Sequence, residues 1–335
     1  MSFVATVKTD FERAVAILRF GGVVGFPTET VYGLGARAFD KKAVACVYRL
    51  KGRPANNPLI VHVNGLAQLK EVASRVPPMA QKLIQAFWPG PLTLILEKSA
   101  RIPKGVTSGL DTVAVRMPNH PLALKLLKEL GEPIAAPSAN RSGRPSPTTA
   151  MHVREEFGGD LEIVLDGGPC HVGLESTIVD ATGPILRILR PGAITEQQLK
   201  SVAGLSLAHD SQPMTLNSFP PCPGARHRHY APRCRVVLFD RFSISINPHP
   251  LLLGEGGKKV GILCRSVLQR PKNSVYFRRI PGPLSRYARA LFGAVREAEA
   301  AGVKTLYVEA VPDRGLGIAI MDRLRRASQN GKDKS

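Results

Sequence analysis

The sequence of 335 residues predicts an α/β protein with two domains. Short apolar segments alternate with amphipathic segments, and Gly or Pro separates many of them, which is typical of strands alternating with helices. The length exceeds that of one ordinary domain, and a hydrophobic content of 44% can bury a sizeable core. Between about residues 204 and 232 the periodicity vanishes, so we expect the two domains to be joined there.

The first domain is expected at residues 1–204, with helices around a large, twisted, mixed sheet. Residues 205–233 are expected to form a linker. A flexible spacer would be rich in Gly and Ser, whereas this one contains SFPPCPGARHRHYAPR and therefore has a more specific role. A smaller, Rossmann-like α/β/α domain at 234–330 and a disordered tail at 331–335 complete the expected organisation.

The first helix is predicted at residues 10–20, because Gly21 and Gly22 can adopt the left-handed backbone that ends a helix. A strand at 23–26 follows, and Pro27 ends it because proline cannot donate to a sheet ladder. Further strands of this domain are predicted at 59–63, 92–96, 113–117, 134–136, 163–165, 177–180 and 185–189. Helices are predicted at 41–50, 78–86, 121–129, 148–157 and 195–202.

The second domain shows the same alternation. Its strands are predicted at 234–239, 259–263, 275–280 and 305–308, and its helices at 284–301 and 317–327.

Composition limits the class of protein. The longest apolar runs fall far short of the ~20 residues that a membrane helix needs, so no membrane span is expected. The N-terminus has no apolar signal core, which makes a cytoplasmic location the expectation. Five cysteines at irregular spacing indicate reduced thiols rather than a disulfide framework.

The positive charge is concentrated in the C-terminal third. The net charge is +20, and residues 218–335 contain 22 of the 46 Lys and Arg but 8 of the 26 Asp and Glu. Excess positive charge attracts polyanions, which makes RNA a candidate partner of the second domain. A basic surface that only promotes solubility explains the same count.

A cluster of cations and amides lies where a turn meets a strand. Lys51, Arg53 and Asn57 are close together in the chain, and Gly52 lets the backbone approach a ligand. Arg grips phosphate with a fork of donors while Lys supplies a point charge, so the cluster suits a phosphate chain. The alternative is a solvated charged loop. His62 lies in the strand that follows and, by itself, is more often a core histidine than a base.

Other polar residues also follow apolar strands. Ser138 and Asn140 come directly after the strand at 134–136, although Ser and Asn are also common turn formers. Arg116 ends the strand that begins at Thr112, and a buried Arg needs an anion, either a substrate carboxylate or an internal acid. Ser176 precedes another strand. The repetition points to one shared cleft.

Two standard ligand motifs are missing from the sequence. It contains neither a GxxxxGK[ST] phosphate loop nor GxGxxG, so a nucleotide would have to be bound by side chains. A zinc site can be drawn from Cys222, His227, His229 and Cys234, but their spacing matches no standard finger.

The motifs together resemble the Sua5/YrdC/YwlC family of threonylcarbamoyl-AMP synthases, in its longer Sua5 form with a C-terminal domain. The resemblance rests on motifs in family order: FPTETVYGLGA, YRLKGRPANNPLIVHV, FWPGPLT, TVAVRMPNH, APSANRSGRPSPT, GLESTIVD, RILRPGAIT, CPGARHRHYAP and GLGIAIMDRLRRA. It covers both expected domains and implies a YrdC-like fold for the first.

The resemblance implies that L-threonine, bicarbonate or CO2, and ATP form threonylcarbamoyl-AMP and pyrophosphate, the first step of threonylcarbamoyladenosine synthesis for tRNA. Magnesium would accompany the triphosphate, and a threonylcarbamoyl transferase complex would act downstream. The threonine site would comprise Thr30, His62, Arg116 and Ser176. The ATP contacts would comprise Lys51, Arg53, Asn57, Thr112, Ser138, Asn140, Ser146 and Arg190, with Tyr230 folding back over the nucleotide to close the cleft.

Two alternatives remain at this stage. One is an RNA-binding or regulatory protein of the same fold without turnover, although RNA binding alone would not demand Thr30, Arg116 and Ser176. The other is carbamoyl-phosphate chemistry as in hydrogenase-maturation proteins, which the missing zinc-finger and acylphosphatase-like regions disfavour. A tRNA contact through the basic C-terminal domain is compatible with the leading hypothesis.

Overall fold

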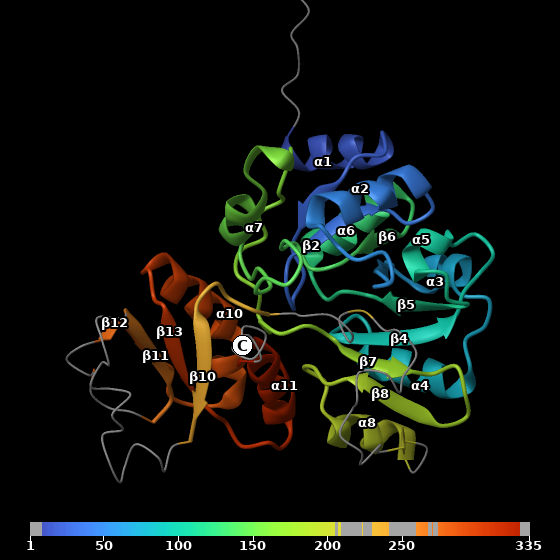
Figure 1. Cartoon of the computed structure of the whole chain (residues 1–335). Coiled ribbons are helices and arrows are strands. Elements are labelled where there is room, and N and C mark those ends of the chain that lie inside the picture. Colours follow the sequence, from blue (N-terminus) through green and yellow to red (C-terminus); the bar gives the residue numbers. More distant parts are fainter. Residues whose placement is uncertain are drawn as a thin grey trace, which may run out of the picture.

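The computed structural model describes residues 9–204, 207–208, 223, 230–240, 259–266, 270 and 274–328. Within these residues two sheets form two domains, which Figure 1 shows side by side. None of the described helices is long and apolar enough to cross a membrane. The predicted tail and most of the predicted linker lie outside the described residues.

The first domain is built on a mixed sheet, as predicted. Among the described residues, nine strands follow the order β1-β2-β6-β3-β5-β4-β7-β8-β9. β3 pairs in parallel with β5 and antiparallel with β6. The strands are β1 (Val24–Phe26), β2 (Gly33–Arg37), β3 (Ile60–His62), β4 (Leu92–Glu97), β5 (Thr112–Arg116), β6 (Ile134–Ala136), β7 (Thr177–Asp180), β8 (Leu186–Arg190) and β9 (Leu207–Ala208).

Several helices of this domain begin or end at residues that satisfy their free backbone groups. Thr9 caps α1 and Thr195 caps α8, each in a reciprocal capping box, and Gly52 ends α2 in the left-handed conformation with φ 64°. The helices are α1 (Asp10–Arg19), α2 (Lys41–Lys51), α3 (Leu66–Val72), α4 (Pro78–Phe87), α5 (Lys104–Thr107), α6 (Pro121–Leu130), α7 (Ala150–Phe157), the short 3-10 helix η1 (Gly158–Asp160) and α8 (Glu196–Ala203).

The two faces of the central strands have different surroundings. Alternate residues such as Val61 and Val115 pack with α2, α3 and α4 in the main core. On the opposite face α1 and α6 cover β1 and β6. On that same face, residues of the remaining strands form a small apolar cluster: Ile60, Ile95, Ala114, Ile178 and Leu189. Ile60 of this cluster lines the candidate site described below.

Strand β2 was not predicted, and its glycines explain why. A Cβ atom at Gly33 would lie 2.8 Å from the Phe26 ring, and one at Gly35 would lie 2.7 Å from it. The ring therefore occupies the space of two side chains, and the segment lacks the alternation that marks a strand. Helices α3 and α5 were also not predicted.

The strand predicted at 163–165 is reduced to an isolated bridge between Val164 and Gly25. Ile163 and Leu165 are buried with α1, α6 and β1, whereas Val164 belongs to the main core. The segment was predicted as a strand because its residues are apolar. They are apolar because they are buried, not because they pair in a ladder.

The second domain contains a parallel sheet in the order β10-β13-β11-β12, as its Rossmann-like pattern predicted. In the described part, α10 and α11 pack on one face of this sheet and share a core with it. Figure 1 shows α10 and α11 between this sheet and the first domain. The elements are β10 (Arg235–Phe239), β11 (Val260–Cys264), β12 (Ser274–Arg279), α10 (Leu284–Ala300), β13 (Thr305–Glu309) and α11 (Leu316–Ser328).

Candidate functional site

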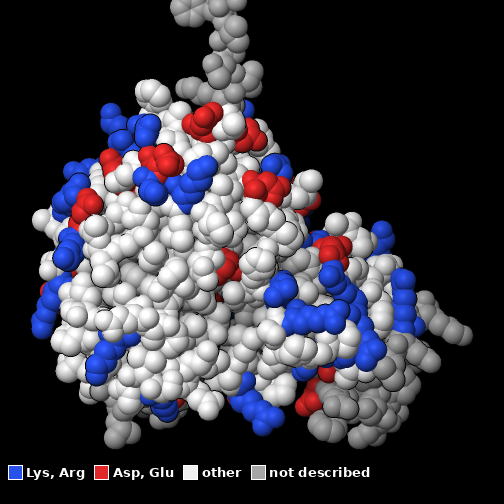
Figure 2. Space-filling view, turned by 180° about the vertical axis from the view of Figure 1, so that it is seen from behind, with Lys and Arg blue, Asp and Glu red and all other residues white. Residues whose placement is uncertain are grey.

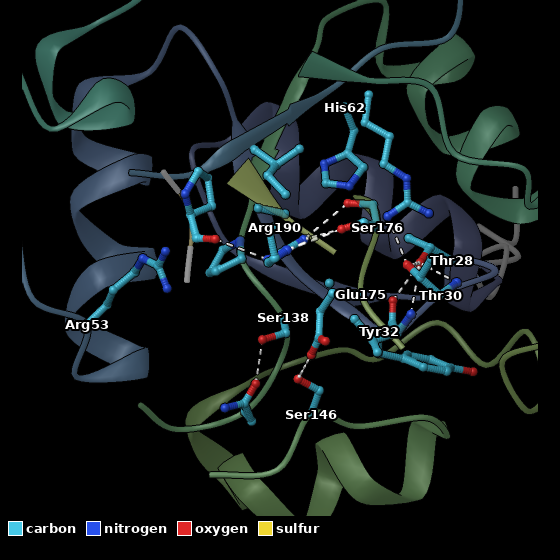
Figure 3. A pocket seen from close by; sticks show the side chains of 18 of the residues that line it. Thr28, Thr30, Tyr32, Arg53, His62, Ser138, Ser146, Glu175, Ser176 and Arg190 are labelled. Carbon is cyan, nitrogen blue, oxygen red and sulfur yellow. Dashed lines mark hydrogen bonds between the residues drawn. The ribbon is translucent and has the colours of Figure 1, made fainter. Parts of the chain in front are cut away.

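A pocket of about 640 Å³, including its open mouth, lies against the first sheet. Ten of the thirteen site residues named from the sequence line it: Thr30, Arg53, His62, Arg116, Ser138, Asn140, Ser146, Ser176, Arg190 and Tyr230. Its lining combines apolar side chains with a few convergent polar and charged ones, as in small-molecule sites. In Figure 3, Arg53 and Thr30 lie at opposite sides of the pocket, with Arg190 between them.

The predicted shared cleft is confirmed, but it does not lie along one edge of the sheet. His62 and Arg116 end the parallel strands β3 and β5, where they are register partners. Ser138 follows β6, which runs antiparallel to β3, so it lies near the opposite end of these strands. The pocket therefore extends across a face of the sheet between strand ends.

Arg116 is buried at one end of the pocket and meets an internal acid. Its Nη2 lies 2.7 Å from Oε1 of Glu29, a close charge contact rather than an aligned hydrogen bond. Its Nη1 donates to Thr30 Oγ1 at 2.8 Å, and its Nε donates to the Gly90 carbonyl at 3.2 Å. Of the two anions expected for Arg116, the structure contains the internal carboxylate, which reasoning from the sequence did not name.

His62 projects from β3 into the same end of the pocket. Burial, together with the Arg116 charge, lowers the pKa of His62 to about 3. The ring is therefore neutral near pH 7, and its buried Nδ1 has no hydrogen-bond partner in the structure. Because it lines the pocket, His62 is not an ordinary core histidine, although the edge of its ring does pack on Phe26.

Ser176 and Arg190 form the middle of the pocket. Arg190 donates through Nη2 to the Ser176 carbonyl at 2.9 Å and to its hydroxyl at 3.2 Å. The same guanidinium donates through Nη1 to the Pro223 carbonyl at 3.1 Å, so it connects the first domain with the linker. Thr93 Oγ1 lies 2.7 Å from Ser176 Oγ and holds the hydroxyl from below.

The residues of the cationic segment at the end of α2 have two different roles: Arg53 lines the pocket, and the others support it. Arg53 lines the pocket, and Asn57 holds it by accepting hydrogen bonds at its backbone and side-chain oxygens, at 2.9 and 2.6 Å. Burial lowers the pKa of Arg53 to about 10, so the group stays charged near pH 7. The alternative of a solvated charged loop is therefore wrong, since Lys51 and Asn57 are each 2% exposed.

Lys51 supports the loop after β6 instead of lining the pocket. Its Nζ donates to the carbonyls of Ser138 and Asn140 at 2.7 and 2.6 Å. Ser138 donates in turn to Asn140 Oδ1 at 2.6 Å. Burial lowers the pKa of Lys51 well below its usual value. Thr112, at the start of β5, is not among the residues that line the pocket.

Four polar residues that line the pocket are not among the site residues predicted from the sequence. Glu175 is 6% exposed, accepts from Ser146 at 2.5 Å and pairs with Arg323 at 2.9 Å. Burial alone would raise its pKa, but the Arg323 and Arg190 charges outweigh burial and lower it. The others are Thr28, Tyr32 and Arg144. Glu175 lies beside Ser176 in the chain, so the strand-end pattern could have included it.

Tyr230 lies over the pocket from the end of the linker. Its ring stacks on Phe292 at 5.6 Å, and the Arg323 guanidinium lies 5.2 Å from the ring centroid. Its backbone has φ 64°, which is uncommon for a residue other than Gly. Cys222, His227 and His229 of the considered zinc site lie outside the described residues, and the described part contains no group of three metal-ligating side chains.

The fold and the site define a class of protein: a two-domain α/β protein with a preformed, cation-lined pocket that Pro223 and Tyr230 help to line. Two family models cover most of the chain. The one described as telomere recombination, for the Sua5, YciO and YrdC proteins, matches residues 16–192. The one described as threonylcarbamoyl-AMP synthase, C-terminal domain, matches residues 194–329. The chain belongs to the Sua5/YciO/YrdC family, with the C-terminal domain of its Sua5 members.

Similar proteins match over nearly the whole chain. A protein of Pyrococcus abyssi named threonylcarbamoyl-AMP synthase is 43% identical, with 98% of each chain covered. One of the same name from Bacillus subtilis is 41% identical and covers 97% of this chain and 94% of its own. The crystal structure of P. abyssi Sua5 complexed with L-threonine superimposes with a TM-score of 0.88 at 42% identity, over 96% of this chain and 95% of that one.

Proposed function

We propose that the chain is a threonylcarbamoyl-AMP synthase, which forms threonylcarbamoyl-AMP and pyrophosphate from L-threonine, bicarbonate or CO2, and ATP. The observation that carries the proposal is one pocket that contains all four residues predicted for threonine together with Arg53, Arg190 and the serines predicted for ATP. Relatives that match along the full length bear the same name.

The chemistry needs positioning and charge rather than a protein nucleophile. The amine of threonine takes up CO2 as a carbamate, a carbamate oxygen attacks the α-phosphorus of ATP, and pyrophosphate leaves. Arg116 and Thr30 would hold threonine at one end, while Arg53 and Ser138 would hold the nucleotide at the other. Such fixed cations in a pocket can neutralise the charge that moves to the leaving pyrophosphate.

Magnesium belongs to the proposal as a companion of ATP. Its preferred ligands are oxygens, which the triphosphate and water supply. Lys51, Asn57 and Thr112 lie outside the pocket lining, so we propose that Lys51 and Asn57 support the nucleotide site through Asn140 and Arg53. We assign no contact to Thr112.

The test is to incubate the purified protein with ATP, Mg²⁺, bicarbonate and threonine, and to measure pyrophosphate and the threonylcarbamoyl adduct. Both products should require threonine. Serine is the informative competitor because it lacks one methyl group, which is worth roughly 1–3 kcal/mol in an apolar pocket. A protein that binds ATP but forms no adduct would contradict the proposal and favour a regulatory or RNA-binding role.

Two further partners are part of the proposal. Figure 2 shows Lys and Arg side chains gathered on one face of the C-terminal domain. Arg279, Arg286 and Arg289 are exposed residues of this domain. Such charge suits a tRNA contact, and the transferase that consumes the adduct would act downstream. Filter binding of tRNA at increasing salt tests the contact, because phosphate contacts weaken with salt.

A further inference from the structure

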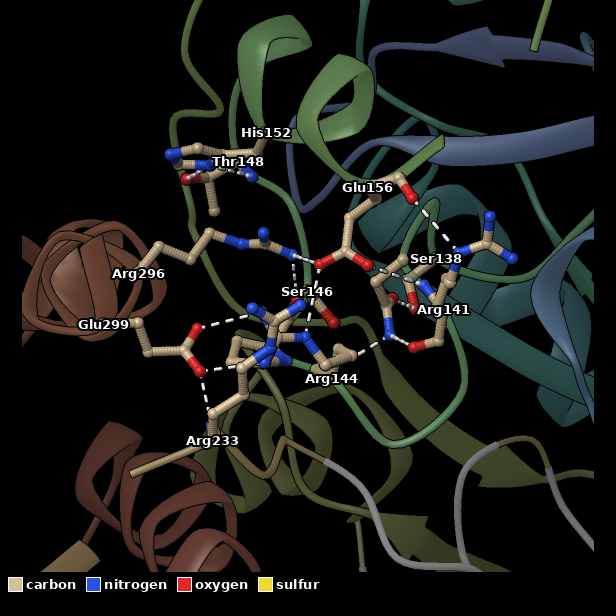
Figure 4. A network of polar contacts seen from close by, with 12 residues as sticks. Ser138, Arg141, Arg144, Ser146, Thr148, His152, Glu156, Arg233, Arg296 and Glu299 are labelled. Atoms are coloured by element: carbon tan, nitrogen blue, oxygen red, sulfur yellow. Dashed lines mark hydrogen bonds and ion pairs between the residues drawn. The ribbon is translucent and has the colours of Figure 1, made fainter. Parts of the chain in front are cut away.

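The C-terminal domain contacts a short segment that contributes to the pocket lining, residues 143–146, which we call the 143–146 loop. The loop contributes Arg144 and Ser146 to the pocket lining. Each of its four residues has a partner that belongs to the C-terminal domain, adjoins it in the linker, or is held by it. Figure 4 shows Arg296 and Glu299 of α10 meeting this loop.

The first half of the loop is held by the linker and by α10. The carbonyl of Gly143 accepts a hydrogen bond from the Ala231 backbone at 2.8 Å. Arg144 forms two parallel hydrogen bonds with the carboxylate of Glu299, at 2.8 and 3.0 Å. Glu299 also accepts a short hydrogen bond from the Arg233 backbone. This fork-to-fork geometry fixes direction as well as distance.

The second half is held by α10 and α11. Arg296 donates through Nη2 to the Pro145 carbonyl at 2.5 Å, and the same nitrogen lies 2.9 Å from Glu156. Ser146 donates to Glu175 at 2.5 Å, and the other oxygen of Glu175 accepts from Arg323 at 2.9 Å. The Glu175 carboxylate therefore joins α11 to a residue that lines the pocket.

These contacts are buried, so the charged groups depend on well-aligned partners. Arg323 is 1% exposed and Arg296 is 8% exposed, so neither charge can turn to water. A buried ion pair tolerates little loss of alignment, because each misplaced charge carries an uncompensated desolvation cost. Within the first domain, the loop is held by Asn140, which donates to the Arg144 carbonyl at 2.9 Å, and by Glu156, 3.6 Å from Arg144.

We propose that the C-terminal domain is a working part of the nucleotide site, with Arg296 and Arg323 as positioning residues for the 143–146 loop. Arg296 acts through Pro145, and Arg323 acts through Glu175 on Ser146. Neither lines the pocket. The inference rests on the proposed function for the identity of the ligand, the phosphate-bearing end of ATP. At the threonine end, the Thr30 carbonyl accepts a hydrogen bond from Gly173, which packs on the backbone of α10, so that end is supported by backbone packing rather than by Arg296 or Arg323.

The experiment compares Arg296→Gln and Arg323→Gln with Arg289→Gln as the matched control. Arg289 also lies on α10 and donates across the domain boundary, to the His171 carbonyl at 2.7 Å, but it does not touch the loop. Calorimetric titration with ATP and Mg²⁺ should show binding weakened about tenfold in the two test variants, and threonine binding within about twofold. The control should match the unmodified protein for both ligands.

A double-mutant cycle separates positioning from general loosening. On a Ser146→Ala background, Arg323→Gln should cost much less ATP affinity than it does alone, because its route to the ligand is gone. Arg296→Lys retains a donor and a charge, so it should bind ATP more tightly than Arg296→Gln does. This pair of variants provides the test if Arg323→Gln does not fold.

Three outcomes would overturn the inference: unchanged ATP affinity in both variants, equal weakening of ATP and threonine, or additive effects in the cycle. The proposed function fails separately, if the unmodified protein forms no pyrophosphate with all substrates present. Because the binding measurements need no turnover, they test the loop even then.

Discussion

Arg116 and Glu29 form a buried ion pair at the threonine end of the pocket, 2.7 Å apart. A free carboxylate that bound Arg116 alone would leave Glu29 unbalanced in a site of low dielectric. An amino acid carries both a carboxylate and an ammonium group. Its carboxylate can bind Arg116 while its ammonium group balances Glu29, so no buried charge is left alone. The pair therefore suits an amino acid better than a simple carboxylic acid.

Arg116→Ala should raise the KM for threonine by about tenfold or more, because a charge-assisted hydrogen bond is worth ~1.5–3 kcal/mol. The KM for ATP should change far less, since Arg53 lies across the pocket from Thr30, which Arg116 contacts. Steady-state kinetics with each substrate varied in turn measures both. The double variant Arg116→Ala/Glu29→Gln controls for the unbalanced carboxylate, and equal changes in both KM values would refute the assigned role.

His62 should make the folded state sensitive to acid. Its pKa is about 3 in the folded state against an ordinary 6.5, so between these values the unfolded chain binds a proton that the folded chain does not. Stability should therefore fall as pH decreases from 6.5 towards 3, by at most about 1.4 kcal/mol per pH unit from this residue.

Chemical denaturation over this pH range measures the slope, and His62→Gln should show a shallower one. Burial also lowers the pKa of His152, to about 4, so part of the slope should remain in the variant. An identical slope in both proteins would contradict the low pKa of His62. His62 also does not supply a protonation step to activity near pH 7, where it is neutral throughout.

At the scale of elements, the pairing of β1 with β2 shows how a large side chain replaces two small ones. Phe26 lies on Gly33 and Gly35 across the strand pair, and its ring also meets the edge of His62 at 5.6 Å. The glycines are thus part of the support of a residue that lines the pocket. Glycine is needed at these positions because the Phe26 ring approaches the backbone closely, not because the backbone adopts an unusual angle.

Gly33→Ala should destabilise the protein by ~1–3 kcal/mol, because its new methyl group would lie 2.8 Å from the Phe26 ring. Gly159→Ala is the matched control, since nothing lies within 4 Å of a Cβ atom there. Thermal unfolding of both variants makes the comparison. Phe26→Leu in the Gly33→Ala background should restore part of the loss, and equal stability of the two single variants would contradict the packing argument.

At the scale of the whole molecule, the pocket is covered by parts that belong to different domains. Its lining includes Ile60 of the first sheet, whereas Tyr230, which also lines it, rests on Phe292 and Arg323 of the second domain. Gly173 marks the contact between the domains, where a Cβ atom would lie 2.4 Å from the backbone of Arg289. The cover therefore depends on the domains remaining docked.

Tyr230→Ala should lower the ratio of threonylcarbamoyl-AMP to pyrophosphate. Without the ring, water would reach a mixed anhydride that hydrolyses readily, while pyrophosphate would still be released. Chromatography of both products over time measures the ratio. Tyr230→Phe retains the stacking on Phe292 and should behave like the unmodified protein. An unchanged ratio in Tyr230→Ala would remove the argument for closure.

Much of the fold and site followed from local pattern. Helix caps, proline and the alternation of apolar residues are properties of neighbouring positions, so most helices and strands of both domains were predictable. The same holds for polar residues at strand ends such as Ser138, Ser176 and Arg190. Their convergence could be expected because the sequence repeats this arrangement several times.

Long-range contacts decided the rest. Strand β2 was missed because the ring that fills the space over its glycines belongs to another strand. The partners of Glu29 and Glu175 could not be assigned from sequence, since Arg116 and Arg323 are far away in the chain. The sequence by itself thus determined the elements and the chemical groups of the site. The tertiary structure alone decided which charges neutralise one another, because that depends on distances that only the folded chain creates.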